Sequence, residues 1–272
     1  MSPHRRLFSV MAVTLEHAPT GHLASVCWLV VHVGQLWRYP VKSFGGERLQ
    51  SATIESDGLR GDHVWAVVDA ESGTVATAKK FRRFGVLLTC GARLTDETDP
   101  RDPASLELTF PDGTVMLGDD SEVDAMLSDL TGHPVRLEAR ARSYDAAPLH
   151  VVTSSSVNAL DTGDPIEVAV RRFRPTIVVD TGDMDGFVEN DWLGVLLELG
   201  DVVIEPNKRT DRCVMVTLDH QEIPARREML RNVMSRNRVL TREGGKEAPC
   251  VGVYAQVSAQ GVVHCGDPVD RI

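Results

Sequence analysis

The feature that most constrains the fold of this 272-residue chain is a series of short apolar segments separated by turn residues. Residues 105–110 and 114–118 alternate apolar and polar positions on either side of Pro-Asp-Gly at 111–113, which is the pattern of a β-hairpin. Segments rich in aromatic and β-branched residues also occur at 34–41 and 63–70. Strands with turns every ~8–12 residues are typical of barrels and sandwiches. The sequence therefore predicts a mainly β fold of the α+β type.

Two segments carry the apolar spacing of helices. Residues 121–132 place apolar side chains on one helical face, with Ser121 as the expected N-cap and Gly132 as the end. Residues 224–237 place Pro224 in the first turn of a second helix. We expect the apolar side chains of this second helix to pack inward, namely Met229, Leu230, Val233 and Met234.

Further strands are predicted in both halves of the chain. Residues 85–94, 149–153 and 213–218 combine apolar and β-branched side chains, and we expect each to be a strand. A cluster of threonine and serine follows the second of these segments, at 153–156, and predicts the capped start of a short helix.

A polar, irregular segment at residues 140–146 is the best candidate for a domain boundary. The predicted organisation is an extension at 1–33, a β-barrel-like domain at 34–140 and a second β-barrel domain with a few helices at 141–272. The apolar run Ala24–Val33 is too short for a transmembrane helix and lacks a following cleavage site. We expect the extension to be disordered and without function, and no membrane partner.

Composition narrows the class of function. The formal net charge of −10 argues against a broad surface for nucleic acid or anionic membranes, but it leaves room for a local basic pocket for one anionic ligand. The five cysteines form no Cys-x-x-Cys or zinc-finger spacing, which disfavours a structural zinc or a disulfide scaffold. Reduced thiols in a cytoplasmic protein are the simplest expectation.

Cys213 lies between Arg212 and a run of strand-forming residues, and several roles are open to it. A cysteine near a strand start is most often a small buried apolar side chain. An adjacent arginine stabilises the thiolate, which is the form that attacks substrates or binds metals, and a thiolate suits a heavy transition metal. No histidine follows in a protease-like signature, which disfavours a Cys/His dyad.

Two other positions combine cations with backbone donors. Lys42 and Ser43 precede two glycines at the end of a predicted strand, which fits either a phosphate cradle or an ordinary surface turn. Their spacing does not fit a Walker A loop. Arg174 precedes Pro175 and an apolar strand, and it fits either a planar fork for phosphate or a heterocycle, or a surface ion pair.

Taken in order along the chain, these segments resemble a known family. Residues 36–80, which include Tyr-Pro-Val-Lys-Ser, are similar to the N-terminal β-barrel domain that precedes MOSC domains. Arg-Phe-Arg-Pro at 172–175, Arg-Cys at 212–213 and Gly-Val-Tyr at 252–254 resemble motifs of the MOSC domain itself. MOSC domains occur in amidoxime-reducing enzymes and at the C-termini of molybdenum cofactor sulfurases. The resemblance covers residues 34 to 270.

The resemblance implies a binding site for the molybdenum cofactor, a molybdopterin. It assigns the molybdenum ligand and catalytic position to Cys213, beside Arg212, and the contacts with the cofactor phosphate to Lys42 and Ser43. Arg174 and Tyr254 would hold the pterin. Two further positions, Asp145 and Thr153, look similar to family positions near the cofactor. At the family level, pyridoxal phosphate binding is also implied.

One position departs from the family pattern. Family members typically carry an arginine that grips the phosphate where this chain has His63, in Gly-Asp-His-Val-Trp. Histidine can donate a hydrogen bond to phosphate, but it is only partly charged near neutral pH. Arg60, three residues earlier, can substitute for the missing arginine. The departure bears on how tightly the cofactor is held rather than on where it binds.

The resemblance implies an oxidoreductase that reduces N-hydroxylated or N-oxide compounds by two electrons. The chain shows no plant-type iron–sulfur cysteine spacing, so a separate ferredoxin- or flavin-type protein would supply the electrons. The alternative is a sulfur carrier with a persulfide on Cys213, or a carrier that holds the cofactor without turnover. The domain layout is common to both kinds of protein and does not separate them.

Overall fold

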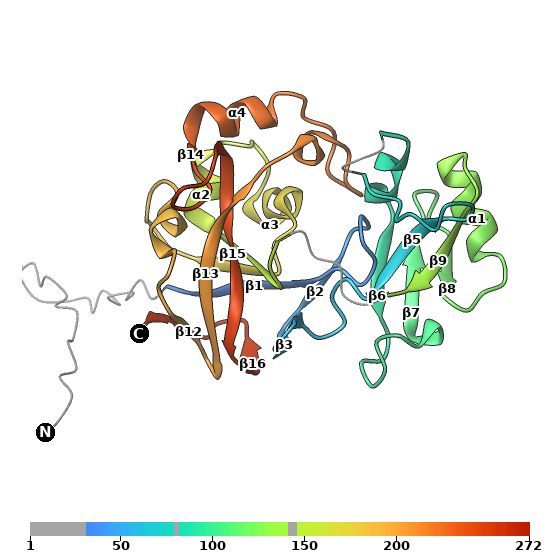
Figure 1. Cartoon of the computed structure of the whole chain (residues 1–272), viewed down its shortest axis with the longest axis horizontal. Coiled ribbons are helices and arrows are strands. Elements are labelled where there is room, and N and C mark those ends of the chain that lie inside the picture. The colour runs from blue at the N-terminus through green and yellow to red at the C-terminus, as the bar shows by residue number, and fades with distance from the viewer. Residues whose placement is uncertain (1–30, 79–81, 141–145) are drawn as a thin grey trace, which may run out of the picture.

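The computed structural model describes residues 31–78, 82–140 and 146–272 (Figure 1). Most of the predicted extension, residues 1–30, and the candidate residue Asp145 lie outside these ranges. The strands are β1 (His32–Arg38), β2 (Glu47–Leu49), β3 (Ser51–Glu55), β4 (Gly58–Leu59), β5 (Trp65–Asp69), β6 (Gly91–Leu94), β7 (Leu106–Thr109), β8 (Val115–Leu117), β9 (Val135–Ala139), β10 (Leu149–Thr153), β11 (Ile177–Asp180), β12 (Leu197–Leu199), β13 (Val202–Asp211), β14 (Arg238–Leu240), β15 (Glu247–Ala259), β16 (Gly261–His264) and β17 (Val269–Arg271). The helices are α1 (Val123–Thr131), α2 (Ser154–Ala159), α3 (Ile166–Ala169) and α4 (Met229–Arg236), with 3₁₀ helices η1 (Arg82–Thr89), η2 (Pro103–Ser105), η3 (Val170–Phe173), η4 (Val188–Trp192) and η5 (Val214–Thr217).

The largest sheet has nine strands within the described residues, and its main path runs β17-β12-β13-β15-β10-β11-β1-β2, with β14 beside β15. Its pairs are antiparallel except β10 with β11. The mainly β prediction is confirmed. In the described part of the chain no ladder joins the two end strands β17 and β2, and an isolated bridge between His32 of β1 and Pro268 is the contact at this edge, so no closed barrel of paired strands forms.

The molecule has two lobes, which lie side by side in Figure 1. The large lobe contains β1–β4, β10–β17 and the helices after β10, and the small lobe contains β5–β9 with η1, η2 and α1. Strand β1 pairs with β11, and β3 pairs with β16, so the first four strands are built into the sheets of the second half of the chain. The predicted division at residue 140 falls beside the undescribed segment 141–145 and stays a prediction.

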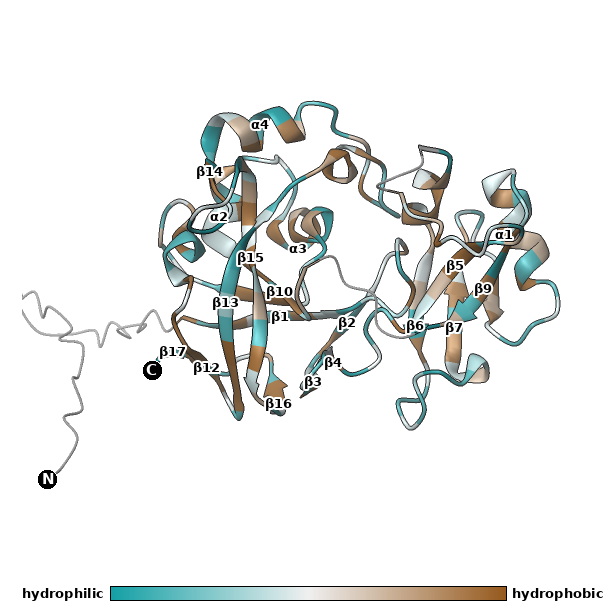
Figure 2. Cartoon of the chain, viewed as in Figure 1, coloured by the Kyte–Doolittle hydropathy of each residue, from teal (hydrophilic) through white to brown (hydrophobic). Residues whose placement is uncertain are grey.

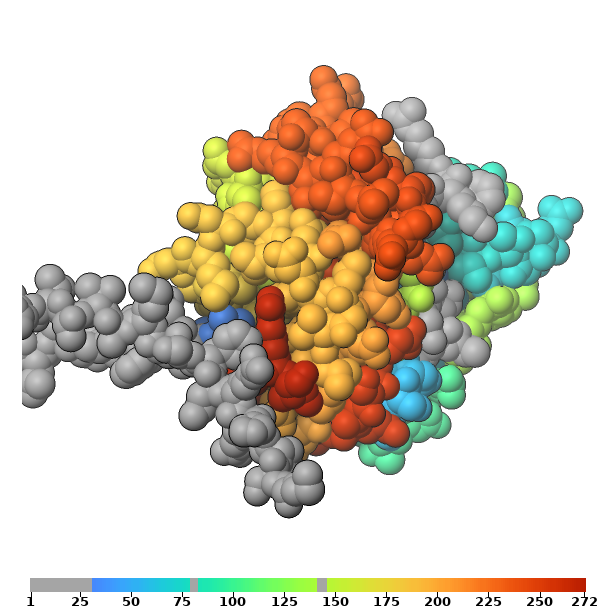
Figure 3. All heavy atoms as spheres, turned by 60° about the vertical axis from the view of Figure 1, so that its left-hand side comes forward, coloured from blue at the N-terminus to red at the C-terminus, as the bar shows by residue number. Residues whose placement is uncertain are grey.

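Each lobe has its own cluster of buried apolar side chains. Leu36 and Ile54 are buried with Val151, Ile177 and Val253 in the large lobe. Figure 2 colours β10, β12 and β16 of this lobe largely as hydrophobic. A second cluster fills the small lobe with Phe44, Trp65, Leu87, Leu106, Leu127 and their neighbours. Burial of such side chains stabilises each by about 1.5–3 kcal/mol relative to exposure. The space-filling view in Figure 3 shows the second half of the chain as one continuous body with the small lobe at its side.

The first predicted hairpin and helix are confirmed, with one correction. Strands β7 and β8 pair in register around Pro-Asp-Gly. Helix α1 ends at Gly132, whose φ of 63° is the left-handed conformation that glycine adopts easily. The predicted Ser121 cap is wrong. Glu122 is the N-cap residue without a side-chain cap, and the carboxylate of Asp120 accepts from the backbone N–H of Glu122 instead.

Two predicted strands are helical in part or throughout. Residues 82–89 form η1, with Phe84, Leu87 and Leu88 buried, and only the last part of the predicted strand 85–94 is extended, as β6. Burial at positions i, i+3 and i+4 is a helical spacing, which the apolar run alone concealed. Residues 214–217 form η5 rather than a strand, because the chain turns away from β15 after Arg212.

The second predicted helix, α4, is shorter than expected. It begins at Met229 rather than near Pro224. Met229 and Val233 are buried and Leu230 is partly buried against the same apolar cluster. The inward packing predicted for Met234 is wrong, since this side chain is 46% exposed. The Thr153 cap of α2 is confirmed, because its hydroxyl accepts from the backbone N–H of Ser156.

Candidate functional site

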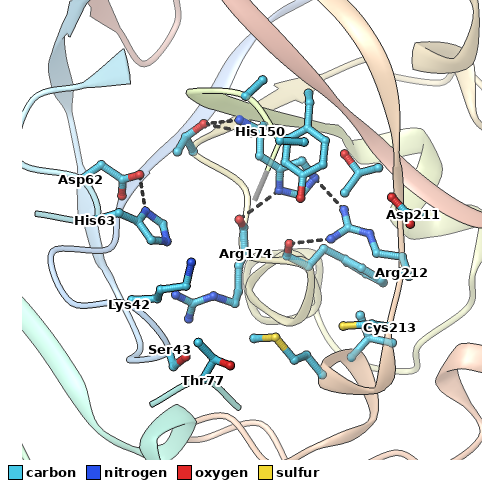
Figure 4. A pocket seen from close by; sticks show the side chains of 18 of the residues that line it. Lys42, Ser43, Asp62, His63, Thr77, His150, Arg174, Asp211, Arg212 and Cys213 are labelled. Carbon is cyan, nitrogen blue, oxygen red and sulfur yellow. Dashed lines mark hydrogen bonds and ion pairs between the residues drawn. The ribbon is translucent and has the colours of Figure 1, made fainter. Parts of the chain in front are cut away.

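A cavity of ≈ 560 Å³ lies between residues of the two lobes. Seven of the predicted site residues line it: Lys42, Ser43, His63, Arg174, Arg212, Cys213 and Tyr254. Lys42, Ser43 and His63 come from the loops that follow β1 and β4, whereas Arg212 and Cys213 directly follow β13. Figure 4 shows the loop residues on one side of the cavity and Arg212 and Cys213 on the other, with Arg174 between them.

Sheet register explains why one wall forms. Strands β13, β15 and β10 are neighbours, and Tyr254 on β15 lies opposite both Lys208 on β13 and His150 on β10. Residues opposite each other across a strand pair present their side chains on the same face. The rings of His150 and Tyr254 have centroids 5.4 Å apart, and the Lys208 ammonium lies 5.8 Å from the Tyr254 ring centre. Long-range pairing thus gathers residues that are about a hundred positions apart in the chain.

The opposite wall is built on unusual backbone. Ser43 has φ of 69° and His63 has φ of 53°, and Arg174 between the walls also has φ of 53°. Non-glycine residues adopt this left-handed region rarely, and each such residue carries a cost of about 1–3 kcal/mol. Three of the five non-glycine residues with positive φ in the described chain therefore line this one cavity. Such clustering is typical of a site whose geometry serves a ligand.

His63 is oriented by its neighbour Asp62. The Asp62 carboxylate lies 2.6 Å from Nδ1 of His63 and also accepts the backbone N–H of Tyr39 at 2.7 Å. Because a carboxylate accepts, Nδ1 of His63 is the donor in this contact. Asp62 is 6% exposed, so its position is fixed by packing. The aspartate therefore fixes the orientation of the His63 ring at the cavity wall.

Arg174 ties the two walls together. Its guanidinium donates to the backbone carbonyl of Phe44 and lies 4.2 Å from the centre of the Tyr39 ring. Burial raises the pKa of Tyr39, so this ring is a neutral partner for the cation. Arg174 thus reaches from the large-lobe segment before β11 to the loop that carries Lys42 and Ser43.

Arg212 is half-buried in a network of acceptors. It donates to the carbonyls of Val251 and Phe173, the latter at 3.0 Å, and its Nη2 lies 2.6 Å from Nε2 of His150. The other ring nitrogen of His150 lies 3.0 Å from the backbone oxygen of Arg174. Burial, and next the charge of Arg212, hold the pKa of His150 well below its usual range. Sequence reasoning missed His150, whose signal was a lone histidine in an otherwise apolar strand.

Cys213 presents a half-buried thiol at the end of β13. Its backbone is extended, and it precedes the first residue of η5. Met215, two residues later, also lines the cavity. Among the described residues no group of three or more histidine, cysteine, aspartate or glutamate side chains is placed to hold a metal ion. A metal bound at Cys213 would therefore need its remaining ligands from a cofactor rather than from the protein.

The charges of the lining residues favour an anion. Five lining residues are cationic: Lys42, Arg172, Arg174, Lys208 and Arg212. The acidic members that the described residues contribute are Asp62 and Asp211, and both have cationic or donor partners. Burial opposes ionisation of Asp211, but hydrogen bonds from Lys208 and Lys246 outweigh it and lower the pKa to about 2. A local basic pocket therefore exists in a chain of net charge −10.

Buried polar atoms of the lining that have no hydrogen-bond partner in the described part of the chain include Nε of Arg172 and Oγ1 of Thr210, and both residues are 1% exposed. A buried donor without an acceptor costs about 1–3 kcal/mol. The cationic lining, the two orphaned groups and a single accessible thiol fit a phosphate-bearing, oxygen-rich cofactor that brings a thiophilic metal.

Two candidate residues lie away from the cavity. Arg60 donates to Glu55 at 3.0 Å and to the carbonyl of Glu97 at 3.1 Å, and these contacts hold its guanidinium elsewhere. Thr153 is fully buried, where it caps α2 and donates to the Glu189 carboxylate at 2.6 Å. This buried position stabilises the start of α2 rather than contacting a ligand.

Comparison with known proteins gives two matching families. The MOSC domain matches residues 112–270, and the MOSC N-terminal beta barrel domain matches residues 30–167. Together these matches span almost all of the described chain. They agree with the mainly β architecture.

Named relatives are amidoxime-reducing components. The chain is 28% identical to mitochondrial amidoxime-reducing component 1 of Homo sapiens, over 87% of this chain and 82% of that protein. The Xenopus laevis protein of the same name is 26% identical over 88% and 82%. The Danio rerio protein is 32% identical, but over only 47% of this chain and 38% of the relative. The YuaD protein from Bacillus subtilis is a similar solved structure, with 12% identity, a TM-score of 0.44, and coverage of 88% of this chain and 94% of that one.

These names leave two expectations without support. The relatives are named mitochondrial proteins, and their names therefore give no support to the predicted cytoplasmic location. Neither the family descriptions nor these names mention pyridoxal phosphate. Separately, none of the helices in the described ranges is long and apolar enough to cross a membrane.

Proposed function

The chain belongs to the MOSC family and carries the family's N-terminal beta barrel domain, and from this premise we propose that it is an oxidoreductase that binds the molybdenum cofactor in the inter-lobe cavity. We further propose that it reduces N-hydroxylated compounds, because the named relatives are amidoxime-reducing components. A separate ferredoxin- or flavin-type protein would supply the electrons.

The observation that carries the proposal is the composition of the cavity. It combines one half-buried thiol, five cationic side chains and two buried polar groups without partners among the described residues. A soft, anionic thiolate keeps a molybdenum ion bound through a change of oxidation state. The cofactor would supply the redox and oxygen-atom chemistry, and the protein supplies binding and orientation.

Each residue then has a distinct task. Lys42, Ser43 and His63, which form the loop wall of the cavity, would donate to the cofactor phosphate. Arg174 would orient the pterin, and its contact with Phe44 keeps it between the walls. Cys213 would hold the metal at the opposite wall. Tyr254 is placed beside His150 and Lys208 on the same face of the sheet, where it would border the pterin.

The proposal is tested by cofactor content and by turnover. Purified wild-type protein should contain molybdenum and pterin and should reduce an amidoxime with a reduced ferredoxin or flavin-protein donor. Cys213→Ala should abolish reduction. The matched control is Cys265→Ala, since Cys265 is partly buried against the β2 carbonyl of Leu49 and does not line the cavity. Fully loaded wild-type protein that reduces no N-hydroxylated compound would refute the reductase function.

The half-buried thiol of Cys213 also suits a second candidate, a sulfur carrier. In that case the thiol would carry one additional sulfur atom as a persulfide. Intact-protein mass spectrometry distinguishes the two candidates. An adduct of one sulfur atom that disappears in Cys213→Ala, in protein that contains no molybdenum, would favour the carrier.

A further inference from the structure

His150 occupies the centre of the cavity's polar network, although the proposed function assigns no task to it. It lies on β10, is 8% exposed and lines the cavity. One ring nitrogen meets Arg212, the other meets the backbone of Arg174, and its ring face lies beside Tyr254. His150 is thus in contact with three residues that approach the proposed cofactor from different segments. Figure 4 shows His150 between Arg174 and Arg212.

The partners of His150 define its protonation. A guanidinium can only donate, so Nε2 of His150 accepts from Arg212 across 2.6 Å. A backbone carbonyl can only accept, so Nδ1 carries the proton and donates to Arg174 across 3.0 Å. The ring is therefore neutral and of the Nδ1–H form. A second proton would remove the acceptor of Arg212 and place a third positive charge between two arginines.

The neighbouring strand is shaped to admit this ring. Gly252 on β15 has φ of 77°, and a Cβ added there would lie 2.7 Å from Nε2 of His150 and 2.5 Å from the backbone oxygen of Val151. A side chain at this position would therefore push against the atom that accepts from Arg212. Because β15 approaches so closely, the Val251 carbonyl and Nε2 of His150 both accept hydrogen bonds from the guanidinium of Arg212.

We propose that His150 is a positioning residue of the cofactor site, which as a neutral Nδ1–H imidazole couples the guanidinium of Arg212 to the left-handed turn at Arg174. It would set the spacing between the segment that carries Cys213 and the arginine that orients the pterin. A neutral ring does this without adding charge beside two cations. The inference rests on the proposed function for its consequence, but its geometry concerns the protein alone.

Two isosteric variants separate the two hydrogen bonds. In His150→Asn the amide nitrogen replaces Nδ1 and keeps the bond to the Arg174 carbonyl, while Arg212 loses one acceptor. In His150→Gln the amide oxygen replaces Nε2 and keeps the bond from Arg212, while the Arg174 turn loses its donor. His150→Phe removes both bonds. The control is His264→Asn on β16, which is exposed and remote from the cavity.

Cofactor binding and metal environment are the first readouts. We expect each amide variant to bind the cofactor roughly tenfold more weakly than wild type, since one bond to a charged or strained group is lost, and the phenylalanine variant to bind more weakly than either. The electron paramagnetic resonance spectrum of the bound molybdenum should change in His150→Asn, which frees Arg212 beside Cys213, and should stay close to wild type in His150→Gln. Wild-type affinity and spectra in all three variants would overturn the proposal.

Nuclear magnetic resonance supplies a readout that needs no cofactor. Long-range ¹H–¹⁵N correlation of imidazole-labelled wild-type protein should show one protonated and one unprotonated ring nitrogen for His150, assigned by their absence in His150→Gln. Two protonated nitrogens, or the Nε2–H form, would overturn the proposal even if the variants fold poorly. Wild-type protein that binds no cofactor would contradict the proposed function instead, and the resonance spectrum would then decide the inference alone.

Discussion

The two walls of the cavity are built in different ways. The loop wall (Lys42, Ser43 and His63) rests on left-handed turns. The strand wall (His150, Arg212, Cys213 and Tyr254) rests on neighbouring strands, and the polar groups of His150 and Arg212 are bound to the protein itself. We infer that the loop wall contributes more to ligand binding than to stability, although Asp62 holds His63 and the Ser43 hydroxyl accepts from Ala78, whereas the strand wall contributes to both. Changes on the two walls should therefore separate binding from stability.

The largest effect is expected on the strand wall, from Arg212→Met. The change leaves the carbonyl of Phe173 and Nε2 of His150 buried without donors. We expect the free energy of unfolding to fall by about 3 kcal/mol and cofactor binding to be lost. Urea unfolding checks this, with the exposed Arg93→Met as a control that removes only a surface pair with Glu107. Equal losses in the two variants would show that Arg212 contributes no more to stability than an exposed ion pair.

The strand wall should also make stability depend on pH through His150. Its pKa is held well below the ordinary value near 6.5, so above that pH the folded and unfolded states are both neutral. As the pH falls through 6.5, His150 binds a proton in the unfolded chain but not in the folded chain. The free energy of unfolding therefore falls by up to about 1.4 kcal/mol per pH unit. His150→Gln should flatten this slope in unfolding curves recorded at successive pH values. Parallel pH profiles for the two proteins would contradict the assignment.

On the loop wall, Lys42→Met should affect binding more than stability. Removing one cation from the phosphate contacts should weaken cofactor binding about tenfold, the effect of one charge-assisted hydrogen bond of about 1.4 kcal/mol. The free energy of unfolding should fall by less than in Arg212→Met, which removes a donor from two buried acceptors. Calorimetric titration and urea unfolding of the same variant measure the two quantities. A loss of stability comparable with that of Arg212→Met would mean that both walls serve the fold.

The smallest effect is expected from Ser43→Gly. Glycine adopts the φ of 69° found at this position without steric cost, so the unfolding free energy should rise by up to about 1 kcal/mol. The hydroxyl is lost at the same time, and cofactor binding should weaken. Thermal unfolding with and without cofactor measures both changes. A variant that is less stable without cofactor would show that loss of the hydrogen bond from the Ala78 N–H to the Ser43 hydroxyl outweighs the strain of the turn.

Local sequence patterns predicted the β7–β8 hairpin and the end of α1, because these depend on turn and cap chemistry between near neighbours. They failed for η1 and η5, where a short apolar run fits both strand and helix until tertiary contacts choose between them. They also gave no sign that β1–β4 join the large lobe, since that depends on pairing with strands more than a hundred residues away.

In the candidate site, too, local motifs identified residues, whereas long-range contacts decided what they could not. Seven residues carried by family motifs line the cavity, but Arg60 does not, because neighbouring acceptors hold its guanidinium outside. His150 was missed because a single histidine in Leu-His-Val-Val-Thr has no motif. Its importance comes from strand β15 and the segment after β13, which no local pattern connects to it.

We propose that Cys213 holds a metal whose cofactor is anchored by other residues of the cavity. The decisive measurement is the molybdenum and pterin content per chain in wild type, Cys213→Ala and Cys265→Ala. We predict wild-type amounts of both in Cys265→Ala, and in Cys213→Ala a loss of molybdenum that exceeds the loss of pterin, since the loop wall and Arg174 remain. Equal molybdenum in wild type and Cys213→Ala would refute metal binding by Cys213.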